Sequence, residues 1–236
     1  MLDLHSHILP CLDDGPQDVK IALKMARIAV RDGITHMIAT PHCLDGVHDC
    51  RAVDILKCSA QFSLELVNAG IPLRVYPGAE IRLVPEILDL LAQKQLLTLG
   101  GLGKSLLIEL PEQFVEEWIW NTLCQLLSSG LHIIIAHPER NMVLEQNPTF
   151  VKNLIRMGVE FQLTASSLPG RFESFMKQSF VLDLLTSKSV SYIASDAHDA
   201  TQRKPLLHKG YKRIASILGS SFAEEMAASS FDLIGK

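Results

Sequence analysis

Short runs of isoleucine, valine and leucine recur along the chain, and helix-like segments that end in glycine precede several of them. Glycine adopts the left-handed conformation that closes a helix and lets the chain turn into a strand. Four glycines stand directly before an apolar run: Gly33, Gly70, Gly130 and Gly158. Four helix-to-strand joints in one chain predict repeated βα units.

The predicted elements alternate along most of the chain. We expect strands near residues 2–5, 34–40, 72–78, 105–110, 131–136, 159–163 and 190–195. We expect helices near residues 18–32, 50–69, 84–92, 113–129, 148–157, 173–187 and 205–218. Strands that alternate with helices form parallel sheets with right-handed crossovers. If it closes, such a sheet makes a small α/β TIM-like barrel of seven strands; left open, it makes a doubly wound sheet.

Side chains of the kinds that bind metals stand at the ends of six of the seven predicted strands. They are His5, His7, His42, Glu80, Glu109, His137, Asp196 and His198. Barrel enzymes build their active sites at the C-terminal ends of the strands. Taken singly, an HxH pair can be an exposed pair on a strand, and Asp196 can be a helix N-cap. Glu109 is harder to explain, because a carboxylate in a buried strand is costly unless it is paired or binds metal. The repeated placement favours a metal site.

Composition and charge remove other classes of protein. The chain has 236 residues, 47% of them hydrophobic, with 22 basic and 26 acidic residues, and no linker or charge block divides it. We therefore expect one domain, residues 1–236, with no nucleic-acid partner, since nucleic-acid binders usually carry a basic patch or high pI. No apolar run reaches the ~18 residues of a membrane span, and the first residues lack the features of a signal peptide. A cytoplasmic protein without membrane insertion is the expectation.

His132 lies within an apolar run, and we expect it in the core.

The five cysteines do not fit a cysteine-dependent phosphatase. Such an enzyme needs an arginine six positions after the nucleophile, and no cysteine here has one. Their odd number without a CxxC pair predicts reduced thiols. If the chain is a phosphatase, its chemistry depends on the metal site.

The motifs that carry the predicted site resemble those of a known superfamily. They are HSH at 5–7, DDG at 13–15, TPH at 40–42, GAEIR at 78–82, IEL at 108–110, AHPERN at 136–141 and SDAH at 195–198. In combination and in this order they resemble the polymerase-and-histidinol-phosphatase (PHP) superfamily. Within it, they are most similar to the bacterial tyrosine-protein phosphatases of capsule and exopolysaccharide systems, the CpsB/YwqE-like family. The resemblance runs from residue 1 to about residue 205.

The resemblance implies a distorted (β/α)7 barrel, the PHP fold, that holds three metal ions, commonly manganese. It assigns one metal to His5, His7, Glu80 and Asp196. The second metal would share Glu80 and add Glu109 and His137. The third would use His42, His198 and Asp14, with Asp13 as the rival for the last place. Imidazole and carboxylate ligands suit manganese, iron or zinc, and the lack of thiolates argues against a purely structural zinc site.

The resemblance also implies an activity, the hydrolysis of phosphotyrosine by a hydroxide that bridges two metals. Arg140 and Arg203 match family arginines that contact the phosphate, and His42 or His198 is a candidate for proton transfer to the leaving group. The implied partner is a bacterial tyrosine kinase that controls polysaccharide export. Two alternatives stay open: a small-molecule phosphatase of the histidinol-phosphate type, and a metal-loaded module that binds a phosphorylated partner without hydrolysing it. The oligomeric state has no signature in the sequence.

Overall fold

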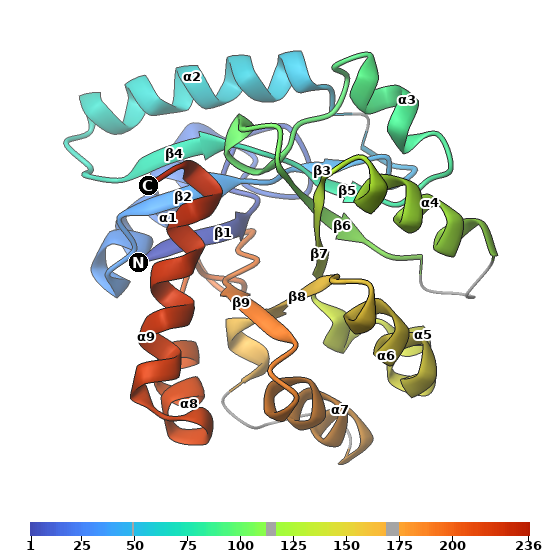
Figure 1. The fold of residues 1–236 in the computed structure, drawn as a ribbon. Helices are drawn as coiled ribbons and strands as arrows, with labels where there is room; N and C mark the ends of the chain where they lie inside the picture. The colour runs from blue at the N-terminus through green and yellow to red at the C-terminus, as the bar shows by residue number, and fades with distance from the viewer. Residues whose placement is uncertain (49, 112–116, 169–174) are drawn as a thin grey trace.

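The apolar runs form short parallel strands that are linked side by side around a ring (Figure 1). The computed structural model describes residues 1–48, 50–111, 117–168 and 175–236. In these residues the strands are β1 (Leu2–Ser6), β2 (His36–Ala39), β3 (His42–Cys43), β4 (Arg74–Pro77), β5 (Glu80–Arg82), β6 (Ser105–Glu109), β7 (His132–Ala136), β8 (Glu160–Thr164) and β9 (Val190–Ala194). Every strand pair is parallel, as the alternation with helices predicts.

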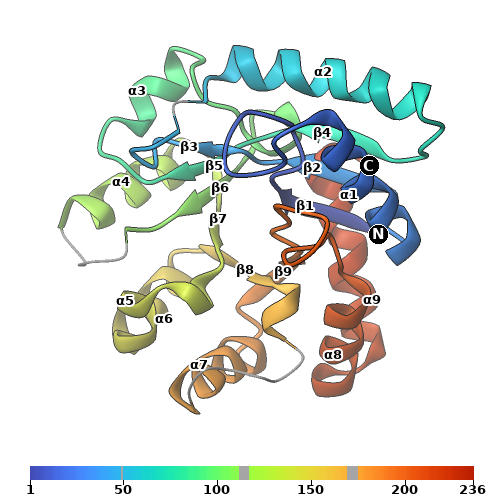
Figure 2. The same ribbon diagram turned by 180° about the vertical axis from the view of Figure 1, so that it is seen from behind.

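Helices lie outside this ring in both views (Figures 1 and 2). They are α1 (Val19–Asp32), α2 (Ala52–Asn68), α3 (Ile87–Ala92), α4 (Glu117–Ser128), α5 (Met142–Gln146), α6 (Pro148–Arg156), α7 (Phe175–Thr186), α8 (His208–Leu218) and α9 (Ser220–Ser229). Four 3-10 turns complete the described chain: η1 (Leu99–Gly101), η2 (Pro138–Arg140), η3 (Ala165–Ser167) and η4 (Ser230–Ile234). The first residues of the predicted helices at 113–129 and 173–187 lie outside the described residues. Among the described residues, no helix combines the length and apolar character that crossing a bilayer requires.

Two predicted strands are each divided into two. The strand expected at 34–40 is β2 followed by β3, and the strand expected at 72–78 is β4 followed by β5. Pro41 separates the first two; it has no N–H to donate, but its carbonyl accepts the backbone N–H of Glu80 at 3.1 Å. Gly78 separates the other two, and a Cβ there would lie 2.7 Å from the Ile38 side chain. The seven expected strands are therefore nine in the described part of the structure.

The ring closes between its first and last strands. β1, β2 and β4 form one sheet, and β3, β5, β6, β7, β8 and β9 form the other. Ser6 pairs with Ala197, and the backbone N–H of Asp196 donates to the carbonyl of His5 at 3.0 Å. Since β2 runs into β3 and β4 runs into β5, the strands make a closed barrel of seven strand segments. The closed alternative of the sequence prediction is confirmed.

Apolar side chains on both faces of the barrel form the core. One buried cluster fills the interior; it comprises Leu2, Leu4, Ile38, Leu99, Leu107, Ile134, Ala136, Tyr192, Ala194, Leu233 and Ile234. A second, larger cluster packs the strands against the surrounding helices. Leu233 and Ile234 come from η4, so the last turn of the chain plugs the end where the strands begin. His132, at the start of β7, is exposed at that end, and its predicted place in the core was wrong.

Candidate metal centre

All eight predicted strand-end ligands lie together at the other end of the barrel, where the strands finish. They are His5 in β1, His7 after it, His42 in β3, Glu80 in β5, Glu109 in β6, His137 after β7, and Asp196 and His198 after β9. Two of them have left-handed backbone conformations that non-glycine residues rarely adopt, with φ of 30° at His137 and 51° at Asp196. Such strain costs about 1–3 kcal/mol and concentrates at functional sites.

The first expected ligand group, His5, His7, Glu80 and Asp196, is assembled. Nε2 of His5 lies 3.2 Å from Nε2 of His7 and 3.2 Å from Oε2 of Glu80. Oδ1 of Asp196 lies 3.4 Å from Nε2 of His5. Metal–ligand distances of about 2.0–2.2 Å put neighbouring ligand atoms about 3.0–3.5 Å apart. The four side chains, all buried, therefore fit a single cation.

Glu80 joins this group to its neighbours. Its Oε1 lies 2.6 Å from Nε2 of His137, while its Oε2 faces His5 and also Nδ1 of His42, at 3.1 Å. The structure groups the ligand atoms of His42, Glu80 and Glu109 within 4.8 Å of one another, and it groups those of His5, Glu80 and His137 in the same way. The second expected set is thus divided between two groups that share Glu80. Glu109 pairs with Arg82, whose Nε lies 3.0 Å from its Oε2.

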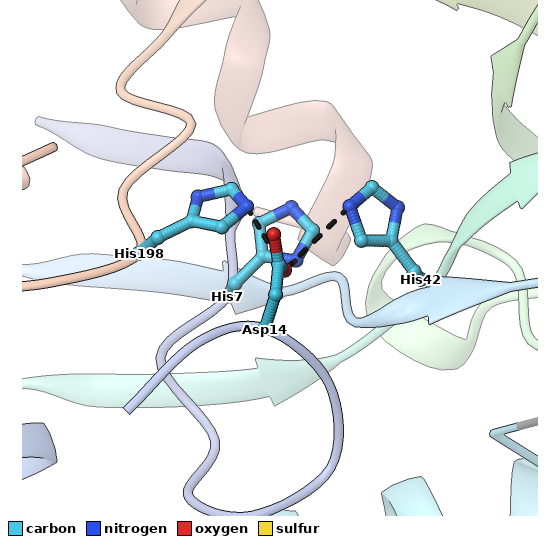
Figure 3. A group of neighbouring side chains, drawn as sticks. All are labelled: His7, Asp14, His42 and His198. Carbon is cyan, nitrogen blue, oxygen red and sulfur yellow. Dashed lines mark ion pairs between the residues drawn. The ribbon is translucent and has the colours of Figure 1, made fainter. Parts of the chain in front are cut away.

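The third group combines His7, His42 and His198 with Asp14 (Figure 3). Oδ1 of Asp14 lies 3.2 Å from Nε2 of His198 and 3.7 Å from Nε2 of His42. Asp13, the alternative candidate for this ligand position, lies instead on the side of the His7 ring that faces away from the group. Its Oδ2 lies 2.6 Å from Nδ1 of that ring. Asp13 also accepts the backbone N–H of His42 at 3.0 Å. The geometry therefore places Asp14 among the potential ligand atoms and Asp13 behind them.

Hydrogen bonds orient three of the imidazoles so that Nε2 faces the centre. Nδ1 of His5 donates to Gln162 at 2.8 Å, Nδ1 of His7 donates to Asp13, and Nδ1 of His198 donates to the carbonyl of Asp196 at 3.0 Å. A ring that donates through Nδ1 presents a lone pair at Nε2, which is the state a metal needs. Nε2 of His198 is buried without a hydrogen bond from the described residues. These residues fit metal ions.

Arg140 and Arg203 both reach the centre from its rim. Nη1 of Arg140 lies 2.5 Å from Oδ2 of Asp196, and Nη2 of Arg203 lies 2.7 Å from the same oxygen. Asp196 therefore turns one oxygen to the histidines and the other to the arginines. Both guanidinium groups are more than a third exposed and line a cavity of about 170 Å³ together with His42, Glu109 and His137. An anion that enters this cavity meets the two arginines beside the potential metal ligands.

Charges in the centre shift the pKa values of its groups strongly. Burial opposes protonation of His7 and His137, but their carboxylate partners outweigh it and raise the pKa of His7 to about 10 and that of His137 to about 9. Burial also opposes ionisation of Glu80, yet the charges of nearby histidines hold its pKa well below the usual range. Burial and the charge of Glu80 raise the pKa of Glu109. In the absence of metal, protonated histidines thus supply the positive charge that balances the ionised carboxylates.

Sequence reasoning missed three residues that support the centre. Gln162 is fully buried in β8, the one predicted strand to which no site residue was assigned. Arg82 lies inside the GAEIR motif and pairs with Glu109. Asp3 accepts hydrogen bonds from the backbone and hydroxyl of Ser195, and so holds the turn that carries Asp196. Alternation along the strands was the available signal for Gln162, since polar residues in a buried strand need partners.

Comparison with known sequences places the chain among capsule-synthesis proteins. Residues 1–232 match the family model "Capsular polysaccharide synthesis, CpsB/CapC". The tyrosine-protein phosphatase YwqE of Bacillus subtilis (strain 168) is 39% identical over 203 residues, which cover 86% of this chain and 79% of YwqE. The putative tyrosine-protein phosphatase CapC of Staphylococcus aureus is 35% identical over 213 residues, 88% of this chain and 80% of CapC.

Solved structures agree with this placement. A structure from a study of YwqE from Bacillus subtilis and CpsB from Streptococcus pneumoniae, described as metal-dependent tyrosine phosphatases, matches with a TM-score of 0.93 and 35% identity. The match covers 99% of this chain and 94% of that one. A β-aspartyl dipeptidase from Fervidobacterium islandicum, at 12% identity and a TM-score of 0.54, shares the fold alone. The chain belongs to the CpsB/CapC family of capsular polysaccharide synthesis.

Proposed function

We propose that this chain is a metal-dependent protein-tyrosine phosphatase and that residues 1–236 act as one catalytic domain. The observation that carries the proposal is the cavity in which two arginines face a buried cluster of histidines and carboxylates. This arrangement suits a phosphomonoester, because the arginines pair with phosphoryl oxygens beside the hydrolytic centre. The names of the relatives YwqE and CapC support the same activity.

The metal ligands in this proposal are those that the sequence resemblance assigns. They are His5, His7, Asp14, His42, Glu80, Glu109, His137, Asp196 and His198. Manganese is the proposed metal, with iron or zinc as substitutes that the same nitrogen and oxygen ligands accept. When bound, the metals supply Lewis-acid activation of water and neutralise charge on the phosphoryl group.

The chain's own residues position the substrate. The planar guanidinium groups of Arg140 and Arg203 each offer paired donors to phosphoryl oxygens, and Asp196 holds both of them at the cavity. Tyrosinate leaves readily because its parent pKa is only ~10, so little proton transfer to the leaving group is needed. His42 lines the cavity and is the proposed donor if one acts. None of the described residues that line this cavity is a cysteine, which agrees with direct attack by water.

The proposed substrate is a phosphorylated bacterial tyrosine kinase of the capsule system, which the enzyme would meet in the cytoplasm, where the kinase has ATP. The family's link to capsular polysaccharide synthesis supports this partner.

The test measures phosphate release by protein that is first chelated and then reconstituted with manganese. A phosphotyrosine peptide, a phosphoserine peptide and histidinol phosphate serve as parallel substrates. The proposal requires metal-dependent turnover that favours phosphotyrosine. Preference for histidinol phosphate would move the enzyme to the small-molecule alternative, and binding of the phosphotyrosine peptide without turnover would leave a binding module.

A paired variant tests the site itself. Glu109→Gln should lower turnover by at least about 100-fold, since a metal ion supplies several kcal/mol of transition-state stabilisation. Glu224→Gln, an exposed carboxylate on α9, is the matched control and should leave turnover unchanged. Equal activity of the two variants would contradict the ligand assignment.

A further inference from the structure

A second groove opens from the rim of the catalytic cavity. It has a volume of about 230 Å³ and shares Arg140, Asp196 and Arg203 with that cavity. From there it continues past Lys204 to Lys209 at the start of α8. A substrate whose phosphate lies at the two arginines can therefore extend directly into this groove.

The groove has a defined shape because α8 packs closely on η3. Gly210 is buried in the first turn of α8, and a Cβ there would lie 2.9 Å from the Cβ of Ala165. This close approach brings Lys209 to the same groove as Ser166 of η3. The carboxylate of Asp199 holds the adjoining loop by accepting backbone N–H groups, including that of Arg203 at 3.1 Å.

The charge of the groove is strongly one-sided. Among the residues that the structure describes, four cationic side chains line the groove, and the only carboxylate there is Asp196, which already pairs with both arginines. Within the described part of the chain, neither Lys204 nor Lys209 has an acidic partner. Two exposed ammonium groups are thus available to a ligand, on a protein whose net charge is −4.

We infer that this groove binds acidic residues next to the phosphotyrosine of a protein substrate. The inference rests on the proposed phosphatase function and adds a sequence preference to it. Aspartate or glutamate beside the phosphotyrosine would pair with Lys204 and Lys209 while the phosphate occupies the arginines. Surface ion pairs are weak and screened by salt. We therefore expect the preference to appear as a lower KM for acidic peptides.

The experiment compares two phosphotyrosine peptides, one with glutamates and one with glutamines on both sides, together with free phosphotyrosine. We expect the glutamate peptide to have the lower KM at low salt, with each lysine contributing about two- to fivefold to the difference. The double variant Lys204→Ala/Lys209→Ala should abolish that difference. Lys212→Ala, an exposed lysine of α8 outside the groove, is the matched control and should keep the preference.

The outcomes separate the two proposals. Hydrolysis of free phosphotyrosine with no difference between the peptides would overturn the groove and leave the phosphatase standing. No hydrolysis of any of them would overturn the phosphatase. A preference that survives in the double lysine variant would place the acidic subsite elsewhere.

An independent observation concerns the outer face of α2. Five exposed apolar residues form a stripe along this helix: Val53, Leu56, Ala60, Leu64 and Val67. Val53, Leu64 and Val67 are 66%, 66% and 75% exposed. The opposite face of α2 packs into the core through residues such as Ile55 and Phe62. Both ribbon views show α2 at the outer edge of the molecule with nothing beyond it (Figures 1 and 2).

The stripe is symmetric about Ala60. Leucines stand four residues to either side of it, at 56 and 64, and valines stand seven residues to either side, at 53 and 67. A two-fold axis through Ala60 that sets two such helices antiparallel pairs Leu56 with Leu64 of the second copy, and Val53 with Val67. The small side chain at the centre lets the helices approach closely. A stripe that matches itself in this way is what an isologous interface requires.

We propose that the α2 stripe, residues 53, 56, 60, 64 and 67, joins two copies of this chain as an antiparallel helix pair. A single helix pair buries less than the roughly 1,600 Å² of a standard interface, so the dimer should dissociate on dilution. A second copy is the occupant that the symmetry specifies; an unrelated partner would not require equal spacing on both sides of Ala60.

Charge exchange across the proposed axis tests the pairing. Leu56→Glu alone and Leu64→Lys alone should each give monomers in sedimentation velocity, because each buries an unpaired charge. The double variant Leu56→Glu/Leu64→Lys should restore the dimer, since each carboxylate then faces an ammonium group of the partner. The two residues lie eight positions apart and do not contact each other within one helix. Circular dichroism checks folding at these exposed positions.

A cross-link tests the axis. A thiol at position 60 would lie on the proposed two-fold axis and face the same thiol of the second copy. Ala60→Cys should therefore form a covalent dimer under mild oxidation. Gln61→Cys, the next residue around the helix, and the unchanged chain with its native cysteines should not. A monomer at all concentrations, or equal cross-linking at positions 60 and 61, would overturn this dimer.

Discussion

At the scale of single residues, hydrogen bonds from behind the rings decide which nitrogen of His5 and of His7 faces the candidate metal centre. Gln162 and Asp13 each accept from the Nδ1 of a ring, those of His5 and His7, and so leave Nε2 directed inward. Groups of this kind fix the tautomer and the ring orientation, and they raise the basicity of the ligand. Gln162 comes from β8, outside every motif that names a ligand, and Asp13 comes from the loop after β1, directly before the proposed ligand Asp14.

Gln162→Leu removes the hydrogen-bond acceptor behind His5 without replacing any proposed ligand. We expect manganese affinity to fall about 10- to 100-fold while the fold is kept, as measured by isothermal titration calorimetry. Gln162→Glu keeps an acceptor in the same place and should retain most of the affinity. Equal loss in both variants would mean that packing, not the hydrogen bond, is what matters at this position.

Metal binding should strengthen as the pH rises. In the protein without metal, the pKa values of about 10 for His7 and about 9 for His137 keep both rings protonated at neutral pH. A metal must displace a proton from each ring, so its apparent affinity should rise about tenfold per pH unit for each proton displaced, up to those pKa values. Calorimetry in buffers of different ionisation enthalpy measures the protons released. Affinity that does not change between pH 6 and 8 would contradict this account.

At the scale of elements, the glycines that end helices were readable from the sequence, while the strand breaks were not. The helix expected at 18–32 is α1, which begins after Asp18, whose carboxylate accepts the N–H of Ile21, and ends at left-handed Gly33. These are local effects of neighbouring residues. By contrast, β3 and β5 exist because Pro41 and Gly78 meet segments distant in the sequence, and no local pattern predicts that.

The turn η1 offers a test of such a close approach. Gly100 and Gly103 both have positive φ, but a Cβ at Gly100 would lie 2.4 Å from the carbonyl of Leu233, whereas Gly103 faces open space. Gly103→Ala should cost only the left-handed strain, about 1–2 kcal/mol of unfolding free energy. Gly100→Ala should cost more, by a further ~1–3 kcal/mol, because backbone must move. Urea unfolding of the two variants measures the difference, and equal costs would show that η4 does not lock this turn.

At the scale of the whole molecule, the barrel divides into a polar end that carries the candidate metal centre and an apolar end sealed by the C-terminal turn. Leu233 and Ile234 are 6% and 7% exposed and complete the interior cluster. The candidate metal centre lies at the opposite end of the strands. Stability and metal binding should therefore respond to different mutations.

Ile234→Ala tests this separation. Loss of the side chain leaves a cavity in the interior cluster and should lower the free energy of unfolding by about 2–4 kcal/mol, with manganese affinity unchanged. Met142→Ala, on an exposed side chain of α5, should change stability by about 0.5 kcal/mol or less. Thermal unfolding and calorimetry on the same samples compare the two properties. A parallel loss of metal affinity in Ile234→Ala would mean that the two ends are coupled.

The sequence by itself determined the alternation of strands and helices, the strand ends at which the chemistry lies, and the family. Those features depend on local periodicity and on motifs whose residues are close together in the chain. Only the tertiary structure decided that the barrel closes, that the carboxylate of Asp14 and not that of Asp13 faces the imidazole rings of His42 and His198, and that Gln162 supports His5. Each of these depends on which distant segments meet, because side chains become partners only when the closed ring of strands brings them together.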